Sequence, residues 1–264
     1  MLTFIKFGGS LITDKRVEGS FHEDVVIRLG REIHSAMAAQ NDLRVLIGHG
    51  SGSFGHFAAR QYGTMQGVHT PEQWRGFAQV GNTAAELNYL VAKALQATGL
   101  PVWRIQPSAS TRSRDGMIVG MAVEPIREAL SRGIVPLVYG DVSLDEVRGG
   151  TIISTETIFF YLARHLPVNQ ILLLGEVEGV YDQHGQIISE ITPANFGAVE
   201  EALGGSAGTD VTGGMETKVR DMLALTQLVH GLTIRIMSGT KPDLLRQTLR
   251  GHTQPGTCIS ASPT

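Results

Sequence analysis

Short apolar runs rich in β-branched residues alternate along the chain with longer stretches in which apolar residues recur at helical spacing. The short runs have the length of buried strands. This pattern predicts strands at residues 2–7, 43–47, 102–105, 135–138, 171–174 and 233–236. Strands separated by helices form mainly parallel sheets that are covered on both faces. We therefore expect an α/β protein, a three-layer α/β/α sandwich with a mainly parallel central sheet.

The helical stretches lie between these runs. One of them carries Val26, Leu29, Ile33 and Met37 at helical spacing and begins with acidic residues, which favour a helix N-terminus. The others are expected at residues 74–95, 124–131, 155–165 and 215–230. One side of stretch 74–95 is apolar and consists of Phe77, Val80, Ala84, Leu87 and Val91. Ligands of such folds bind at the carboxyl ends of the strands, and several glycine-rich segments of this chain fall there.

The length of 264 residues is enough for a substantial core and fits one domain over residues 1–264. No proline- or serine-rich linker and no repeat of fixed period divides the chain. A soft boundary near Pro167, where a new strand follows a helix, separates an N-terminal lobe at 1–168 from a C-terminal lobe at 169–264.

Composition excludes several functional classes. The net charge of −3 gives no basic footprint for nucleic acid, and no run of about 18 apolar residues predicts a membrane span. The N-terminus lacks the features of a secretory signal. The single cysteine, Cys258, excludes a disulfide framework and a multi-cysteine zinc site. We therefore expect a cytoplasmic protein with neither nucleic-acid nor membrane partners.

The first predicted strand contains an unexpected lysine. Lys6 lies in an otherwise apolar run that ends at Gly8, Gly9 and Ser10. A buried ammonium is costly unless an anion lies beside it, and paired glycines let backbone N–H groups approach a ligand closely. The spacing is not that of a P-loop. The segment indicates a phosphate-binding turn, although an ordinary glycine turn has the same pattern.

A second glycine-rich segment follows the strand at 43–47. It spans residues 48–56 and holds glycines at alternating positions, including Gly50 and Gly52, with Ser51 between them. Such backbone suits an oxyanion such as phosphate. His56 can add a charge-assisted hydrogen bond to a phosphate oxygen. For His49, packing against the sheet is the simpler interpretation.

Two further segments have the same character. Gly140 and Asp141 follow the strand at 135–138, where a carboxylate can orient a lysine or hydroxyl or can simply form a turn. In segment 210–218, Gly213 opens a helix and Lys218 lies about one turn further on. A phosphate at that helix start would meet free N–H groups, the positive end of the helix dipole and an ammonium.

Together, these residues favour phosphoryl transfer, because that chemistry needs positioning and charge neutralisation more than a covalent nucleophile. The sequence shows no HEXXH motif, nucleophile elbow or cluster of metal ligands. A nucleotide-sensing protein without catalytic activity is the alternative from another class.

The chain resembles the amino acid kinase family nearly from end to end. The matching segments are residues 6–10, 48–56, 139–142, 175–181 and 210–218. Within the family, segment 49–56 and residues 11–15, 106–109 and 210–215 are most similar to the kinases that act on isopentenyl phosphate. A fosfomycin-type phosphonate kinase, which also has a histidine-bearing loop, is the rival within phosphoryl transfer.

The resemblance implies ATP-dependent phosphorylation of isopentenyl phosphate to its diphosphate, with Mg²⁺, by a homodimer in an alternative mevalonate pathway. It implies that the N-terminal lobe holds the acceptor and the C-terminal lobe the nucleotide. The catalytic residues that it implies are Lys6, Lys15, His56 and Lys218. Nucleotide binding would involve Lys6, Gly8, Gly9, Ser10, Gly52, Glu156, Gly175, Tyr181, Gly213 and Lys218. The acceptor phosphate would contact Gly50, Ser51, His56 and Gly140.

Two segments depart from the family pattern. Ser154-Thr155-Glu156 stands where the family usually has Ser-Gly-Asp, and we expect Glu156 to organise the lysines from this position. Glu176 and Glu178 stand where the family usually has two aspartates, which leaves the nucleotide preference open. The apolar side of stretch 74–95 offers Phe77, Val80 and Ala84 as a wall for the acceptor's tail, or as ordinary core.

Overall fold

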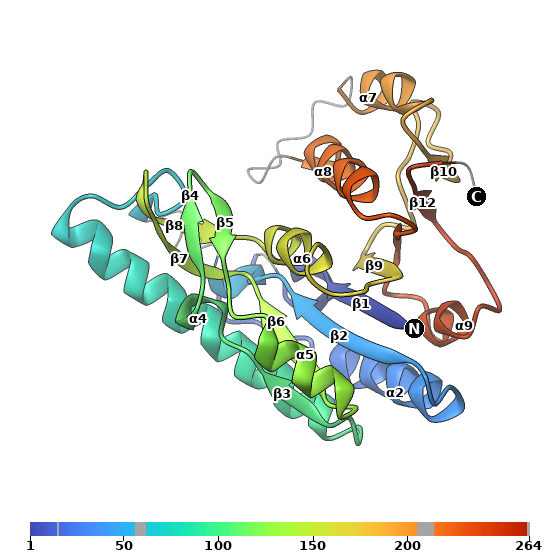
Figure 1. The fold of residues 1–264 in the computed structure, drawn as a ribbon, viewed down its shortest axis with the longest axis horizontal. Helices are drawn as coiled ribbons and strands as arrows, with labels where there is room; N and C mark the ends of the chain where they lie inside the picture. The colour runs from blue at the N-terminus through green and yellow to red at the C-terminus, as the bar shows by residue number, and fades with distance from the viewer. Residues whose placement is uncertain (15, 56–61, 205–213, 263–264) are drawn as a thin grey trace.

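The computed structural model describes residues 1–14, 16–55, 62–204 and 214–262 (Figure 1). Its strands are β1 (Leu2–Phe7), β2 (Arg44–His49), β3 (Val102–Arg104), β4 (Arg112–Arg114), β5 (Met117–Gly120), β6 (Val135–Tyr139), β7 (Asp141–Asp145), β8 (Gly149–Ile153), β9 (Gln170–Gly175), β10 (Glu190–Ile191), β11 (Thr233–Ser238) and β12 (Thr257–Ile259). Its helices are α1 (Gly9–Ile12), α2 (Glu23–Ala39), α4 (Pro71–Gln96), α5 (Glu124–Ser131), α6 (Thr155–Ala163), α7 (Phe196–Gly204), α8 (Gly214–Leu228), α9 (Leu244–Leu249) and the short 3₁₀ helix η1 (Pro107–Ala109).

Eight strands form the central sheet in the order β10-β12-β11-β9-β1-β2-β6-β3. All neighbouring pairs in it are parallel except β11 and β12. The six strands expected from the sequence are all in this sheet, and β1 lies between β9 and β2 near its centre. In register, Lys6 of β1 faces Gly48 on β2 and Leu173 on β9.

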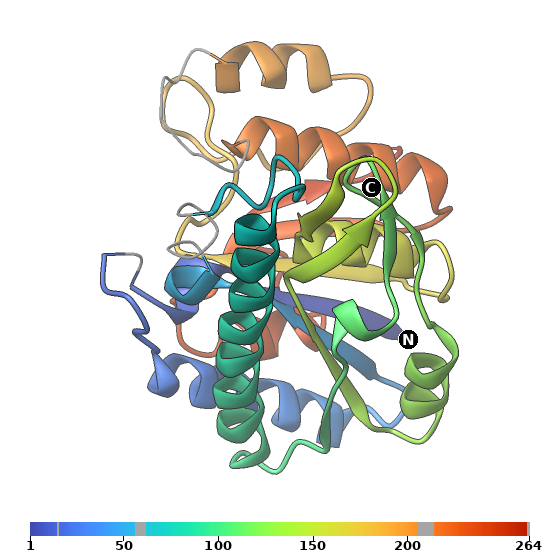
Figure 2. The same cartoon turned by 90° about the vertical axis from the view of Figure 1, so that its left-hand side faces the viewer.

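Two apolar clusters cover the two faces of the sheet. Phe4 and Leu46 pack with α5, α6 and α8 on one face, whereas Ile5 and Ile47 pack with α2, α4 and α9 on the other. Neighbouring residues of β1 and β2 thus point to opposite layers, as the pleat of a strand requires. The expected three-layer α/β/α sandwich is confirmed, and Figure 2 shows α4 running along its side of the sheet.

The expected helices are present; α5 has the expected ends, and the other helices differ from the expected ends by a few residues. The helix expected at 74–95 is α4, which begins at Pro71 because Thr70 and Gln73 form a capping box directly before it. Phe77 is only partly buried, whereas Val80, Ala84, Leu87 and Val91 are buried as expected.

The apolar pattern misses a second, four-stranded sheet with the order β5-β4-β7-β8. These strands have three to five residues each, too few for a clear alternation. It also misses α1, α7, α9, β10 and β12. The division of the chain into lobes at residue 168 stays a prediction.

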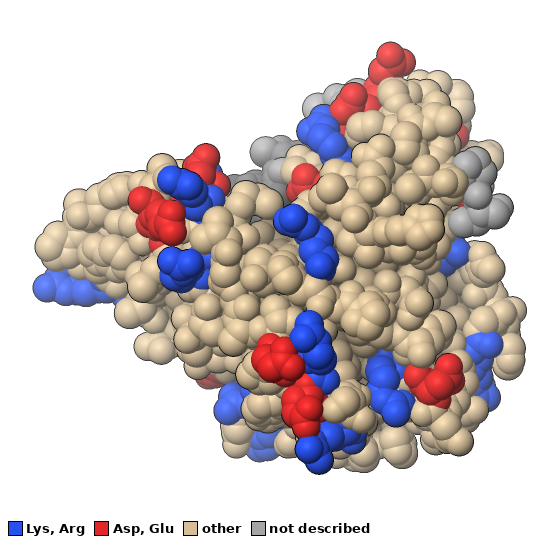
Figure 3. Space-filling view, in the orientation of Figure 1, with Lys and Arg blue, Asp and Glu red and all other residues tan. Residues whose placement is uncertain are grey.

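Within the described ranges, no helix combines the length and the apolar character needed to cross a bilayer. On the face drawn in Figure 3, Lys and Arg are interspersed with Asp and Glu and do not gather into one basic region.

Candidate active site

Lys6 forms an ion pair with Glu156, which lies in the first turn of α6. Only 9% of Lys6 is exposed, so its ammonium depends on this carboxylate for compensation. Lys218 of α8 approaches the same carboxylate, with 4.0 Å between its Nζ and Oε1 of Glu156. One carboxylate from α6 therefore holds together lysines from β1 and α8.

The charge balance of this group keeps Glu156 ionised. Burial raises the pKa of its carboxyl, but the charges of Lys6 and Lys218 and the hydrogen bond from Lys6 outweigh burial, so the pKa lies below its usual range. The group places two ammonium groups around the carboxylate of Glu156. Such a centre can accept an additional phosphate, because ammonium groups form charge-assisted hydrogen bonds with phosphate oxygens.

The two glycine turns after β1 and β2 pack backbone against backbone. A Cβ at Gly9 would lie 2.9 Å from both N and Cα of Gly52, and a Cβ at Gly50 would lie 3.1 Å from N of Gly9. Gly52 also has a φ of +50°, a conformation that glycine adopts readily. The two predicted phosphate turns thus form one continuous surface of main chain beside Lys6.

Thr13 fastens the two turns together. Its hydroxyl donates to the carbonyl of Gly9 at 2.8 Å and accepts from the N–H of Ser53 at 2.9 Å. Thr13 follows α1 and is 1% exposed. One buried hydroxyl therefore fixes the first turn relative to the second.

Thr155 suits its position although the family usually has glycine there. Its hydroxyl donates to the carbonyl of His49 at 2.6 Å, and its methyl group fills the space where a Cβ of Gly48 would lie 2.6 Å away. The carbonyl of His49 also accepts from the N–H of Gly140 at 3.1 Å. The threonine thereby connects α6 to the end of β2, directly before Glu156.

Asp141 is the first residue of β7, and its buried carboxylate does not contact the lysines in the described part of the chain. It accepts hydrogen bonds from the N–H groups of Ser108 at 3.0 Å and Val142 at 2.8 Å. Burial raises the pKa of Asp141, and these bonds and one with the Tyr139 hydroxyl oppose the rise. The two hydrogen bonds from N–H groups thus tie this carboxylate to the backbone around it, and a role in the site stays a prediction.

Two of the predicted nucleotide residues, Gly8 and Gly175, lie at the ends of β1 and β9. The N–H of Gly8 donates to the carbonyl of Leu174 at 2.8 Å, and the carbonyl of Gly175 accepts from the N–H of Gly239 at 2.7 Å. Tyr181 is 38% exposed and forms a bridge with Ile187. The contacts found in the described residues do not connect Tyr181 with the lysine group.

Three of the residues implied by the resemblance, Lys15, His56 and Gly213, lie outside the described residues. Of the others, Lys6, Glu156 and Lys218 form one group, and Gly8, Gly9, Ser10, Gly50, Ser51, Gly52 and Gly140 lie at the ends of the neighbouring strands β1, β2 and β6.

The sequence interpretation did not single out Thr13, Asn88 or Thr155 as site residues. Asn88 of α4 has a usable signal, because it is a polar residue on the buried side of a helix and is 1% exposed. By sequence alone, Thr13 is an ordinary turn residue and Thr155 is an ordinary residue at the start of a helix. Their contacts join segments 40 and 106 residues apart, which no local pattern indicates.

Comparison with known proteins identifies the family of the chain. The amino acid kinase family profile matches residues 1–238, and the chain belongs to the amino acid kinase family. It is a phosphotransferase of that family. Among its relatives, isopentenyl phosphate kinase of Methanothermobacter thermautotrophicus is 33% identical over 98% of this chain and 99% of the relative. The isopentenyl phosphate kinase of Methanocaldococcus jannaschii is 32% identical over 99% of this chain and 100% of the relative.

A solved isopentenyl phosphate kinase superimposes with a TM-score of 0.81 at 29% identity and covers 98% of this chain and 100% of its own. The similarity therefore extends over the whole three-layer fold and not only over the glycine turns.

Proposed function

We propose that this kinase transfers the γ-phosphoryl group of ATP directly to isopentenyl phosphate and forms isopentenyl diphosphate for isoprenoid biosynthesis. An acceptor oxygen forms a bond to the γ-phosphorus while the bond to the β–γ bridging oxygen breaks, and ADP leaves. The observation that carries the proposal is the group of Lys6, Glu156 and Lys218 beside the paired glycine turns. This group offers the positioned positive charge that phosphoryl transfer requires.

On the donor side, Lys6 contacts the transferring phosphoryl group, and Lys218 and Lys15 neutralise charge on the nucleotide phosphates. Support comes from the common countercharge of Lys6 and Lys218. The remaining nucleotide contacts in the proposal are Gly8, Gly9, Ser10, Gly52, Gly175, Tyr181 and Gly213.

On the acceptor side, the backbone at Gly50, Ser51 and Gly140 receives the phosphate, and His56 binds it through a charge-assisted hydrogen bond. The position of Gly140 supports this assignment, because the hydrogen bond from its N–H to the carbonyl of His49 holds the backbone after β6 against the end of β2, beside the Gly50–Ser51 peptide. The N–H of Gly140 is used in this bond, so the proposed N–H donor to the phosphate is that of Ser51, in a backbone concavity of the kind that binds anions.

Mg²⁺ fits this site as a partner of the nucleotide. The described residues include no group of three or more His, Cys, Asp and Glu side chains that could hold a metal. Mg²⁺ commonly binds through one or two carboxylates together with substrate phosphates. When bound with ATP, it would neutralise negative charge that develops during transfer.

The acceptor's tail would lie against a small apolar cluster apart from the two main clusters. Val80 of α4 and Val142 of β7 are buried together, with Phe77 and Ile152 packed on them. Val142 directly follows Asp141 and Gly140, so this apolar group adjoins the proposed phosphate site. A short apolar tail is compatible with this surface.

A direct assay separates the candidate functions. We expect ADP release to depend on isopentenyl phosphate and not on fosfomycin. Turnover with fosfomycin but not with isopentenyl phosphate would favour the phosphonate kinase. Binding of ATP without turnover of either acceptor would favour a nucleotide-sensing protein.

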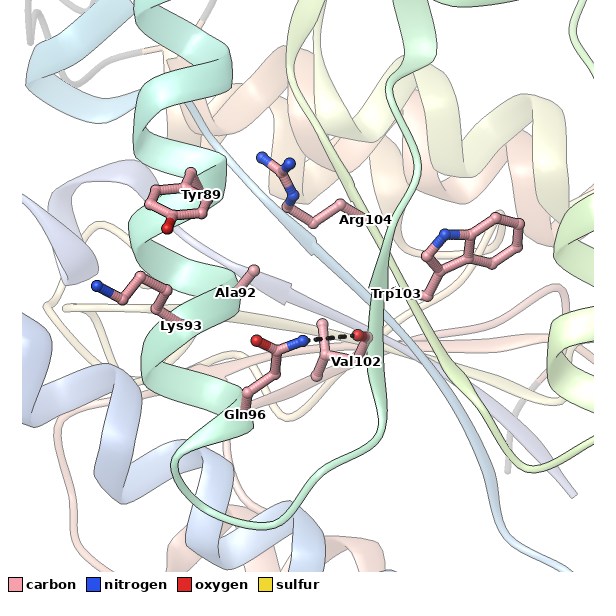
Figure 4. A pocket seen from close by; sticks show the side chains of 7 residues that line it. All are labelled: Tyr89, Ala92, Lys93, Gln96, Val102, Trp103 and Arg104. Carbon is pink, nitrogen blue, oxygen red and sulfur yellow. Dashed lines mark hydrogen bonds between the residues drawn. The ribbon is translucent and has the colours of Figure 1, made fainter.

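We also propose the homodimer that the family resemblance implies, and expect it in the cytoplasm. Strand β3 forms one edge of the central sheet, with β6 and β2 between it and β1. Tyr89 and Trp103, which are 50% and 46% exposed, line a hollow of about 320 Å³ at this edge (Figure 4). Exposed aromatic residues are typical of interfaces. Sedimentation velocity tests this assignment. Trp103→Glu would place a charge at this edge and should give monomers.

A further inference from the structure

His49 is the last residue of β2 and is completely buried. Its ring stacks on Tyr139, with 5.7 Å between ring centres and 10° between ring planes. Its Nδ1 lies 2.9 Å from the carbonyl oxygen of Gly50, and its Nε2 lies 3.0 Å from Nδ2 of Asn88 on α4. Every polar atom of this ring therefore has a partner, and the two partners lie in different elements of the acceptor side.

These contacts determine where the ring proton lies. A carbonyl oxygen can only accept, so Nδ1 must carry the proton and donate it to Gly50. Nε2 is then an acceptor, and the amide of Asn88 donates to it. The histidine is thus neutral with one defined tautomer. Burial lowers the pKa of His49 to about 4, and the Lys6 charge favours the neutral form in opposition to the Gly50 hydrogen bond.

The bond to Gly50 has a consequence for the glycine turn. In a trans peptide, the carbonyl and the N–H of the next residue point in opposite directions. Because the Gly50 carbonyl is held against the His49 ring, the N–H of Ser51 points away from that ring. Ser51 belongs to the turn that packs on Gly9.

We infer that His49 is a positioning residue that, oriented by Asn88, fixes the Gly50–Ser51 peptide so that the Ser51 N–H faces the acceptor phosphate. This inference rests on the proposed function. Asn88 lies one helical turn beyond Ala84, on the same side of α4. The helix proposed to line the acceptor's tail therefore also sets the orientation of the turn that receives its phosphate.

If His49 has a purely structural role, its substitution should have different effects. If the ring only fills space between β2 and α4, replacements should lower activity only as far as they lower the folded fraction. If the ring holds the Gly50 carbonyl, a replacement that keeps the bond to Gly50 should keep acceptor binding better than a replacement that loses this bond.

Two substitutions of His49 separate these possibilities. The side-chain amide of asparagine reaches the position of Nδ1, so His49→Asn can still donate to Gly50. The side-chain amide of glutamine reaches the position of Nε2, so His49→Gln leaves the Gly50 carbonyl without its donor. A matched control is Val91→Ala. Val91 is a buried residue of α4, the helix that carries Asn88, and it packs in the core between α2 and α4.

We expect His49→Gln to raise KM for isopentenyl phosphate roughly tenfold, and His49→Asn to raise it less than about threefold. The KM for ATP should stay within about twofold in both, and Val91→Ala should change neither KM. Equal acceptor KM values in the two His49 variants would overturn the inference.

A second measurement does not depend on turnover. In ¹⁵N-detected spectra of the wild-type protein, His49 should carry its proton on Nδ1, and exchange of the Ser51 amide hydrogen should change more in His49→Gln than in His49→Asn. A proton on Nε2, or equal exchange in both variants, would overturn the inference. Failure of the wild-type protein to phosphorylate isopentenyl phosphate would instead contradict the proposed function.

Discussion

Gly9 and Gly52 approach each other so closely that a Cβ on Gly9 would lie 2.9 Å from the main chain of Gly52. The two glycines follow neighbouring strands. Gly9 belongs to the turn proposed for the donor, and Gly52 directly follows Gly50 and Ser51, which are proposed for the acceptor. Backbone contact at this point brings the two phosphate-binding surfaces together, which is what transfer between two phosphates requires.

Gly9→Ala should lower kcat/KM by roughly 100-fold, because the added methyl group forces the two turns apart by a few tenths of an ångström or more. Gly9 has no positive φ, so the effect would report crowding and not backbone strain. Steady-state kinetics and circular dichroism of the variant test this. Gly197→Ala is the control, since Gly197 is the second residue of α7 and has no neighbour within 4 Å. Wild-type activity in Gly9→Ala would show that the close approach is dispensable.

Glu156→Gln should reduce kcat by roughly 100-fold while the protein stays folded. The amide keeps the size of the side chain but removes the charge that holds Lys6 and Lys218 together. Glu200→Gln is the matched control, because Glu200 pairs with Arg220 at the surface. A kcat within about twofold of the wild-type value would exclude the proposed role of Glu156.

The pH dependence of stability should reveal the buried His49. Its pKa is lowered from 6.5 to about 4 in the folded protein, so the unfolded chain binds a proton here that the folded protein excludes. Stability is therefore lost as pH falls from about 6.5 to about 4, by about 3 kcal/mol from this residue. Urea denaturation at several pH values should show a shallower dependence for His49→Asn. The same slope in both proteins would contradict the assignment of a neutral, buried ring.

The central sheet could be predicted from the sequence because its strands are continuous apolar runs buried on both sides, as in β1 and β9. The helices followed from their buried stripes, such as Val80, Ala84 and Leu87 of α4. The strands of the second sheet, for example β4 with Arg112 and Arg114 exposed, have no comparable signal.

Part of the site could likewise be predicted from the sequence, and part could not. Glycines after buried strands mark where the phosphate turns lie, and Lys6 is conspicuous within an apolar run. The sequence alone could not show that Thr155 binds the carbonyl of His49, because α6 and β2 meet only through the tertiary fold. The ion pairs of Glu156 with Lys6 and Lys218 also depend on how α6, β1 and α8 are placed relative to one another.

His56→Ala should cause a large loss of activity while nucleotide binding is retained, because His56 is assigned to the acceptor phosphate and not to ATP. Isothermal titration with ATP and acceptor kinetics measure the two effects separately. An unchanged rate would remove His56 from the mechanism, and a loss of ATP binding would place it on the donor side.

The most direct test of the proposed reaction is ³¹P NMR of the wild-type protein with ATP, Mg²⁺ and isopentenyl phosphate. We predict that the acceptor's monophosphate resonance disappears while the two coupled resonances of a diphosphate ester and those of ADP appear in equal amounts. An unchanged acceptor resonance, whether ATP persists or is hydrolysed to ADP and inorganic phosphate, would contradict the account.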